Sequence, residues 1–133
     1  MAASMARRQS AQAQPRSLEE IAQGAFGSAF RSVRREGDTA VFEFAPLQDL
    51  PPDSTLRRIY KLGGLAVPPA FRDTPHLKRV RLVALDGRDP SRRLVVFTVT
   101  REASQKIDWQ HLTAEAITAN ATVEHLDPQF GKG

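Results

Sequence analysis

The first strong pattern along the chain is a helical stripe near the N-terminus. Its apolar residues recur every three or four positions, the spacing of one face of an α-helix: Leu18, Ile21, Ala22, Ala25, Phe26, Ala29, Phe30 and Val33. Ser17 to Glu20 has the form of a capping box, which marks a helix start. Arg34 and Arg35 come shortly before Gly37, a combination that is typical of a helix end. The pattern predicts a long N-terminal helix between Ser17 and Gly37.

Two glycines, Gly24 and Gly27, lie inside this stripe and disfavour a helix. Each lowers helix stability by about 1 kcal/mol relative to alanine. We interpret their small size as a sign of close approach between the helix and a sheet. A seam with a second copy of the chain is the alternative.

The pattern then changes from helical spacing to alternation. Residues 38–45 alternate like a half-buried strand. Residues 46–54 form a connection rich in Pro and Asp. A short helix is expected to begin at Asp53 or Ser54 and to end at Gly63-Gly64, with a strand as the alternative. Residues 65–75 hold three prolines, which predicts a loop.

A β-hairpin is the clearest sheet signal. Residues 77–85 and 92–101 both alternate, and the segment 86–91 between them is made of turn-forming residues. In the first strand Val80, Leu82 and Ala84 share a side. Both strands carry apolar residues on both faces, which indicates a central place in the sheet.

The C-terminal part is less clear. Residues 102–112 contain a short helix in our interpretation. From Ile117 onward apolar and polar residues alternate, which favours a strand over the competing helical grouping. Residues 128–133 are polar and rich in glycine, and we expect a frayed tail.

Together these elements predict one α+β domain over residues 17–127, in which the long N-terminal helix packs on an antiparallel sheet of three to four strands. The length of 133 residues and the 41% hydrophobic share suit a single core. The chain has no cysteine, so disulfides and thiolate chemistry are excluded. No apolar run is long enough to span a membrane.

Residues 1–16 carry three arginines and no acidic residue. A flexible basic tail is the favoured interpretation, with a targeting remnant or a functional basic arm as alternatives. A secretory signal is not expected, because the segment lacks an apolar core region. The compartment stays open, with the cytoplasm favoured over an organelle or an exported form whose start is truncated.

Basic and acidic residues are distributed unevenly along the chain. Residues 57–106 hold twelve basic and four acidic residues, whereas the segments 19–56 and 107–133 are both acidic overall. The candidate binding residues are the basic side chains around the hairpin: Arg79, Arg81, Arg88, Arg92, Arg93 and Arg101. They could pair with the acidic segments of the same chain, bind an acidic protein, or contact the phosphates of a nucleic acid.

Catalytic and metal-binding patterns are not found in the sequence. His76, His111 and His125 lack the spacing of a helical metal pair, and no phosphate-binding glycine loop or nucleophile elbow occurs. We therefore expect no enzyme, no cofactor and no metal site. The sequence favours a small protein-interaction or assembly module, which binds a protein partner or a second copy. A nucleic-acid-binding accessory protein that uses the hairpin is the alternative.

Overall fold

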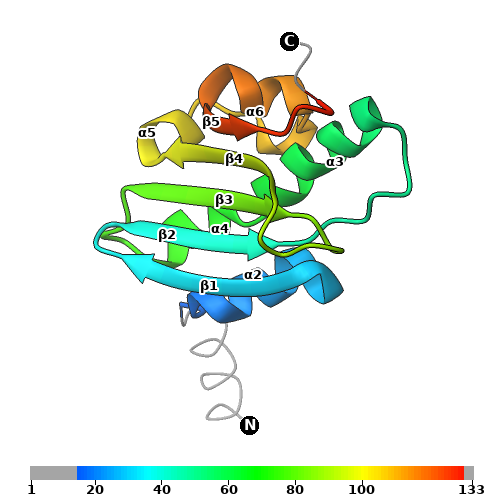
Figure 1. Cartoon of the computed structure of the whole chain (residues 1–133). Coiled ribbons are helices and arrows are strands. Elements are labelled where there is room, and N and C mark those ends of the chain that lie inside the picture. Colours follow the sequence, from blue (N-terminus) through cyan, green and yellow to red (C-terminus); the bar gives the residue numbers. More distant parts are fainter. Residues whose placement is uncertain (1–14, 131–133) are drawn as a thin grey trace, which may run out of the picture.

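The computed structural model describes residues 15–130, which form a five-stranded sheet with helices packed on one face (Figure 1). The strands are β1 (Phe30–Glu36), β2 (Thr39–Phe44), β3 (Arg79–Leu85), β4 (Arg93–Thr100) and β5 (Thr122–Leu126). The helices are α2 (Leu18–Phe26), α3 (Pro52–Gly64), α4 (Val67–Asp73), α5 (Arg101–Ser104) and α6 (Ala114–Asn120), with 3₁₀ turns η1 (Gly27–Ala29) and η2 (Trp109–His111). The α+β class is confirmed, but the sheet has five strands rather than three to four.

The N-terminal helix is shorter than predicted. Its start is the predicted capping box: the Glu20 N–H donates to Ser17 Oγ at 3.1 Å, and the Ser17 N–H donates to Glu20 Oε1 at 2.9 Å. The helix ends at Phe26, because Gly27 adopts a φ of 55°, which takes the backbone out of the α-helical conformation. The prediction of helix up to Gly37 is therefore wrong.

The second half of that predicted helix is the edge strand β1. It pairs antiparallel with β2, and Val33 lies opposite Phe42. The turn between them places Gly37 at a φ of 63°, so this glycine serves a hairpin and does not end a helix. Pairing with β2 supplies the backbone hydrogen bonds that a continued helix would have made internally.

The strand order is sequential, β1-β2-β3-β4-β5, and one neighbouring pair is parallel. Strands β2 and β3 run parallel, so the chain crosses over between them and places α3 and α4 on the sheet. The predicted hairpin is confirmed as the antiparallel pair β3 and β4, with Leu82 opposite Phe97. Strand β5 completes the sheet beside β4.

Helix α3 confirms the helical interpretation of residues 53–64. It begins earlier, at Pro52, and neither Asp53 nor Ser54 caps it, because Pro51 occupies the cap position. The loop predicted over residues 65–75 is wrong, because it contains α4. Pro68 and Pro69 lie in the first turn of α4, where a backbone N–H has no helical partner.

The C-terminal alternation holds two elements. Residues 122–126 are a strand, as predicted, but residues 117–120 belong to helix α6. Thr113 caps this helix by accepting from the Ala116 N–H at 3.1 Å. Phe130 is buried within the expected tail, whose last three residues lie outside the described range, as do residues 1–14 of the N-terminal tail.

Alternation along the central strands divides the apolar residues between two faces. The main core lies under the helices and includes Phe42, Phe44, Leu82, Phe97 and Val99. A smaller cluster lies on the opposite, helix-free face and consists of Val41, Val83, Leu85 and Val96. Among residues 15–130, no helix is both long and apolar enough to cross a bilayer.

Candidate functional site

Two of the candidate arginines lie on the helix-free face of the sheet. Arg79 forms an ion pair with Asp38 at 3.1 Å, and Arg81 forms one with Glu124 at 2.8 Å. Glu124 also accepts a hydrogen bond from the Thr98 hydroxyl at 2.9 Å. These side chains cover a face that no helix covers, and they neutralise one another.

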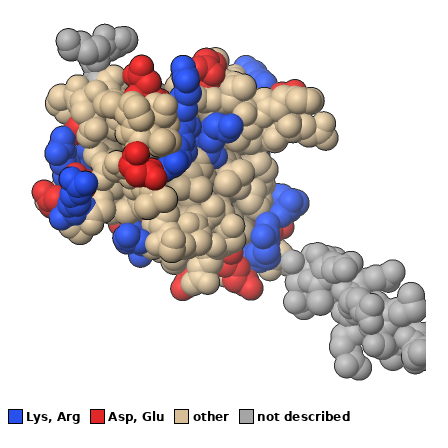
Figure 2. Space-filling model, turned by 90° about the vertical axis from the view of Figure 1, so that its right-hand side faces the viewer, with Lys and Arg blue, Asp and Glu red and all other residues tan. Residues whose placement is uncertain are grey.

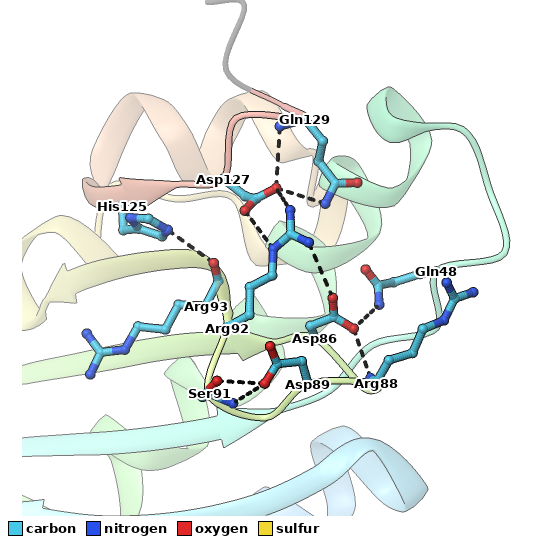
Figure 3. A network of polar contacts seen from close by, with 10 residues as sticks. All are labelled: Gln48, Asp86, Arg88, Asp89, Ser91, Arg92, Arg93, His125, Asp127 and Gln129. Carbon is cyan, nitrogen blue, oxygen red and sulfur yellow. Dashed lines mark hydrogen bonds and ion pairs between the residues drawn. The ribbon is translucent and has the colours of Figure 1, made fainter.

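A polar network surrounds the β3–β4 turn (Figure 3). The Arg92 guanidinium donates two hydrogen bonds to the Asp127 carboxylate, at 3.1 and 2.8 Å, and lies 3.9 Å from Asp86. Gln129 donates to Asp127 at 2.9 Å, and Gln48 donates to Asp86 at 3.1 Å. The network therefore joins the connection after β2, the β3–β4 turn and the end of β5.

The two carboxylates of this network are nearly buried but stay charged. The hydrogen bonds from Arg92 hold the pKa of Asp127 below its usual range, despite the opposing effect of burial. The pKa of Asp86 is also lowered, first by the Arg88 backbone N–H and then by Gln48. Both groups are thus ionised at neutral pH, which suits structural ion pairing and not proton donation.

Arg88 and Arg93 are the least engaged of the predicted set. Within residues 15–130, neither guanidinium has an ion-pair partner, and the Arg93 side chain points away from the network in Figure 3. The backbone carbonyl of Arg93 accepts a hydrogen bond from His125 Nε2 at 3.1 Å. Arg88 lines a polar hollow of about 360 Å³ whose lining also contains Arg92 and the opposing charge of Asp86.

Arg101 lies at the opposite end of β4 and binds the chain itself. Its guanidinium donates to the carbonyl oxygens of Leu77 at 2.8 Å, Phe71 at 3.1 Å, and Thr74 and Pro75 at 3.0 Å each. It also lies 4.8 Å from the centre of the Phe71 ring. Arg101 thus fixes the connection between α4 and β3.

The structure therefore does not gather the six arginines into one surface. Pairing with the acidic flanking segments, one of the alternatives drawn from the sequence, is confirmed for Arg79, Arg81 and Arg92. On the face in Figure 2, basic and acidic side chains of the described residues lie interspersed. Their fields largely cancel at a distance.

The three histidines lie on different elements and are all exposed. His111 contacts Asp108 at 3.0 Å, and His125 contacts a backbone carbonyl. His76 lies in the connection between α4 and β3. In the described part of the chain, no group of three His, Asp or Glu side chains is placed to hold a metal ion.

An apolar hollow on α3 is a second candidate surface, and sequence reasoning missed it. The hollow has a volume of about 470 Å³. It is lined by Arg58, Lys61, Leu62, Leu65, Trp109 and Leu112. Leu65 is 53% exposed. The available signal was that Leu62 and Leu65 lie off the stripe of Leu56, Ile59 and Tyr60 that turns toward the core.

Exposed leucine side chains flank helix α3. Within residues 15–130, four large hydrophobic side chains are exposed: Leu47, Leu50, Leu65 and Val123. Three of them, Leu47, Leu50 and Leu65, lie in α3's flanking segments. We call the hollow and the connection 46–51 together the α3 surface.

Comparisons with family models, curated proteins and solved structures found no match to this chain.

Proposed function

We propose that this chain is a small non-enzymatic protein-interaction or assembly module, and that the α3 surface is its contact site. The observation that carries the proposal is the apolar hollow of about 470 Å³ beside an exposed Leu65. An apolar hollow with an exposed leucine at its wall is typical of a surface that a partner covers. The Trp109 ring, half-buried at the wall of the hollow, supplies the kind of aromatic anchor that dominates protein contacts.

The charges at the hollow favour a partner with acidic residues. Arg58 and Lys61 border the apolar side chains, and the hollow's lining holds no carboxylate. Arg58 is already paired with Asp49 of its own chain at 2.8 Å, so Lys61 is the basic side chain of this lining that has no ion-pair partner among residues 15–130. Basic residues at the rim attract such a partner and set its orientation.

A nucleic-acid role for the hairpin has weaker support. Arg88 and Arg93 are exposed and could contact phosphate. Three others of the set are neutralised by Asp38, Glu124 and Asp127. Single-strand binding on a sheet relies on exposed aromatic rings, and here the strand phenylalanines Phe42, Phe44 and Phe97 face the helical layer.

Quantitative affinity capture tests the proposal. The tagged wild-type chain and two single variants, Leu65→Asp and Val123→Asp, are exposed to an extract of the native source. Both positions are exposed, so both variants are expected to fold. We expect wild type and Val123→Asp to retain the same proteins, and Leu65→Asp to lose them. Equal retention by all three chains would contradict a contact through α3.

The nucleic-acid alternative is tested by measuring the binding of random-sequence duplex DNA to the same preparations at several salt concentrations. Phosphate contacts by Arg88 and Arg93 would give a steep salt dependence that the double variant Arg88→Glu, Arg93→Glu flattens. We expect weak binding that this variant hardly changes. Strong, salt-sensitive binding lost in the variant would favour the alternative over the protein contact.

A further inference from the structure

The α3 surface has two chemically complementary parts. One is the connection 46–51, which exposes Leu47 and Leu50 and carries Asp49 without any basic residue. The other is the hollow, whose lining combines leucine and tryptophan side chains with two basic residues. An acidic, apolar segment and a basic, apolar hollow on one molecule are matching halves of a contact.

The two parts meet at Arg58. Its guanidinium donates to the Leu47 carbonyl oxygen at 3.3 Å and to the Asp49 carboxylate at 2.8 Å, and it also lines the hollow. The hollow then follows one stripe of α3, since its members are three and four residues apart: Arg58, Lys61, Leu62 and Leu65. The segment and the hollow therefore lie along the same side of the helix.

Their positions along α3 suit a two-fold axis. Arg58 is the middle residue of the helix Pro52–Gly64. The connection 46–51 precedes the N-terminus of α3, and Leu65 follows its C-terminus, about 20 Å away along the axis. A two-fold axis perpendicular to α3 at Arg58 would set two helices antiparallel, with the segment of each copy over the hollow of the other. Such an arrangement is isologous and closed, so it yields a dimer and not a filament.

We propose that the occupant of the hollow is the 46–51 segment of a second copy, in a symmetric dimer through α3. Leu47 and Leu50 of one copy contact Leu65, Trp109 and Leu112 of the other. Lys61 attracts the Asp49 carboxylate of the opposing segment. The two Arg58 side chains come near each other at the axis without net repulsion, because each is paired with the Asp49 of its own chain.

This inference rests on the proposed function, since it names the partner that the α3 surface contacts. Sedimentation velocity over a dilution series measures the dissociation of the dimer. The chains compared are wild type, Leu65→Asp in the hollow, the double variant Leu47→Asp, Leu50→Asp in the segment, and the control Val123→Asp. We expect wild type and control to dissociate at the same concentration. A symmetric dimer contains the segment–hollow contact twice, so each substitution weakens both contacts. We therefore expect the two test variants to dissociate at a concentration at least about a hundredfold higher than wild type.

Mixing the two test variants gives a result that simple loss of folding cannot give. A mixed dimer has one intact segment in one intact hollow, so association should return in the mixture and stay absent in each variant alone. Circular dichroism confirms that each variant is folded before mixing. A mixture that remains monomeric, or a control that weakens as much as Leu65→Asp, would overturn the dimer.

The failure of this inference differs from the failure of the proposed function. If wild type is monomeric at every concentration but the hollow variant still loses a captured protein, the dimer is wrong and the interaction module stands. If wild type is monomeric and all chains capture the same proteins, both proposals fail.

Discussion

Gly63 lies where helix α3 packs tightly against the sheet. A Cβ atom at this position would lie 2.8 Å from Cζ of Phe97 and 3.2 Å from Cγ of Leu82, and both of those side chains are fully buried. We expect Gly63→Ala to lower the free energy of unfolding by about 1–3 kcal/mol, because the clash outweighs the gain in helix propensity. Urea denaturation monitored by circular dichroism measures the change.

Gly24 is the matched control in helix α2. The nearest atom to its added Cβ is Arg16 Nη1 at 4.0 Å, so the site has room. Gly24→Ala should therefore raise the free energy of unfolding, by up to about 1 kcal/mol. A stabilised Gly63→Ala variant would show that α3 does not press on Phe97 as closely as the structure places it.

At the scale of elements, burial decides what the sequence can predict. Strands β2, β3 and β4 are central, and their alternating residues face the two sides of the sheet. This alternation allowed the three strands to be predicted from the sequence. Strand β1 lies at the sheet edge with no fully buried residue, and Phe30 and Val33 happen to continue the helical spacing of α2. Its strand conformation depends on pairing with β2, which no local pattern contains.

Short helices were missed for a related reason. In α4 the prolines that suggested a loop fill the first turn, where they are tolerated. In α6 Thr118 and Asn120 dilute the helix propensity of three alanines, and the cap of Thr113 and the packing of Ile117 near Gly64 support the helix. The effect of such residues depends on where they lie in the helix, and composition alone does not give that position.

The candidate site shows the same limit. The basic residues could be counted from the sequence, but their partners lie far along the chain: Arg81 and Glu124 are 43 positions apart, and Arg92 and Asp127 are 35 apart. The hollow forms between α3 and η2, which only the fold brings together. Long-range pairing is what a local pattern does not encode.

At the scale of the whole molecule, Asp127 is a junction. Its side chain is 5% exposed and receives hydrogen bonds from Arg92 and Gln129, while its backbone N–H donates to Leu94 at 2.7 Å. Through Arg92 and Asp86 it is linked to Gln48, which follows β2. One carboxylate thus helps to hold three distant segments at one end of the sheet.

Protonation of Asp127 should weaken this junction. Its folded pKa lies below the unfolded value of about 3.9, so its charge stabilises the fold above that pH, and this contribution is lost as pH falls through the folded pKa. We expect Asp127→Asn to lower the free energy of unfolding at neutral pH by about 1–2 kcal/mol. Below about pH 4, the free energy of unfolding of this variant should also decline less steeply than that of wild type.

Urea titrations at several pH values measure both effects. Glu36→Gln is the control, because Glu36 is an exposed carboxylate whose pKa is lowered by Arg34 at the edge of the sheet. An exposed ion pair contributes little to stability, so this variant should follow the wild-type profile. Identical profiles for Asp127→Asn and wild type would show that the junction does not stabilise the fold.

The parallel pairing of β2 and β3 has a kinetic consequence. The hairpins β1–β2 and β3–β4 each close over a short turn, but joining them requires the chain from Phe44 to Arg79 to come together around α3 and α4. Such non-local closure is slow compared with hairpin formation. We expect the two hairpins to form early and their docking to limit the folding rate. In pulse-labelled hydrogen exchange, the amides between β2 and β3 would gain protection last.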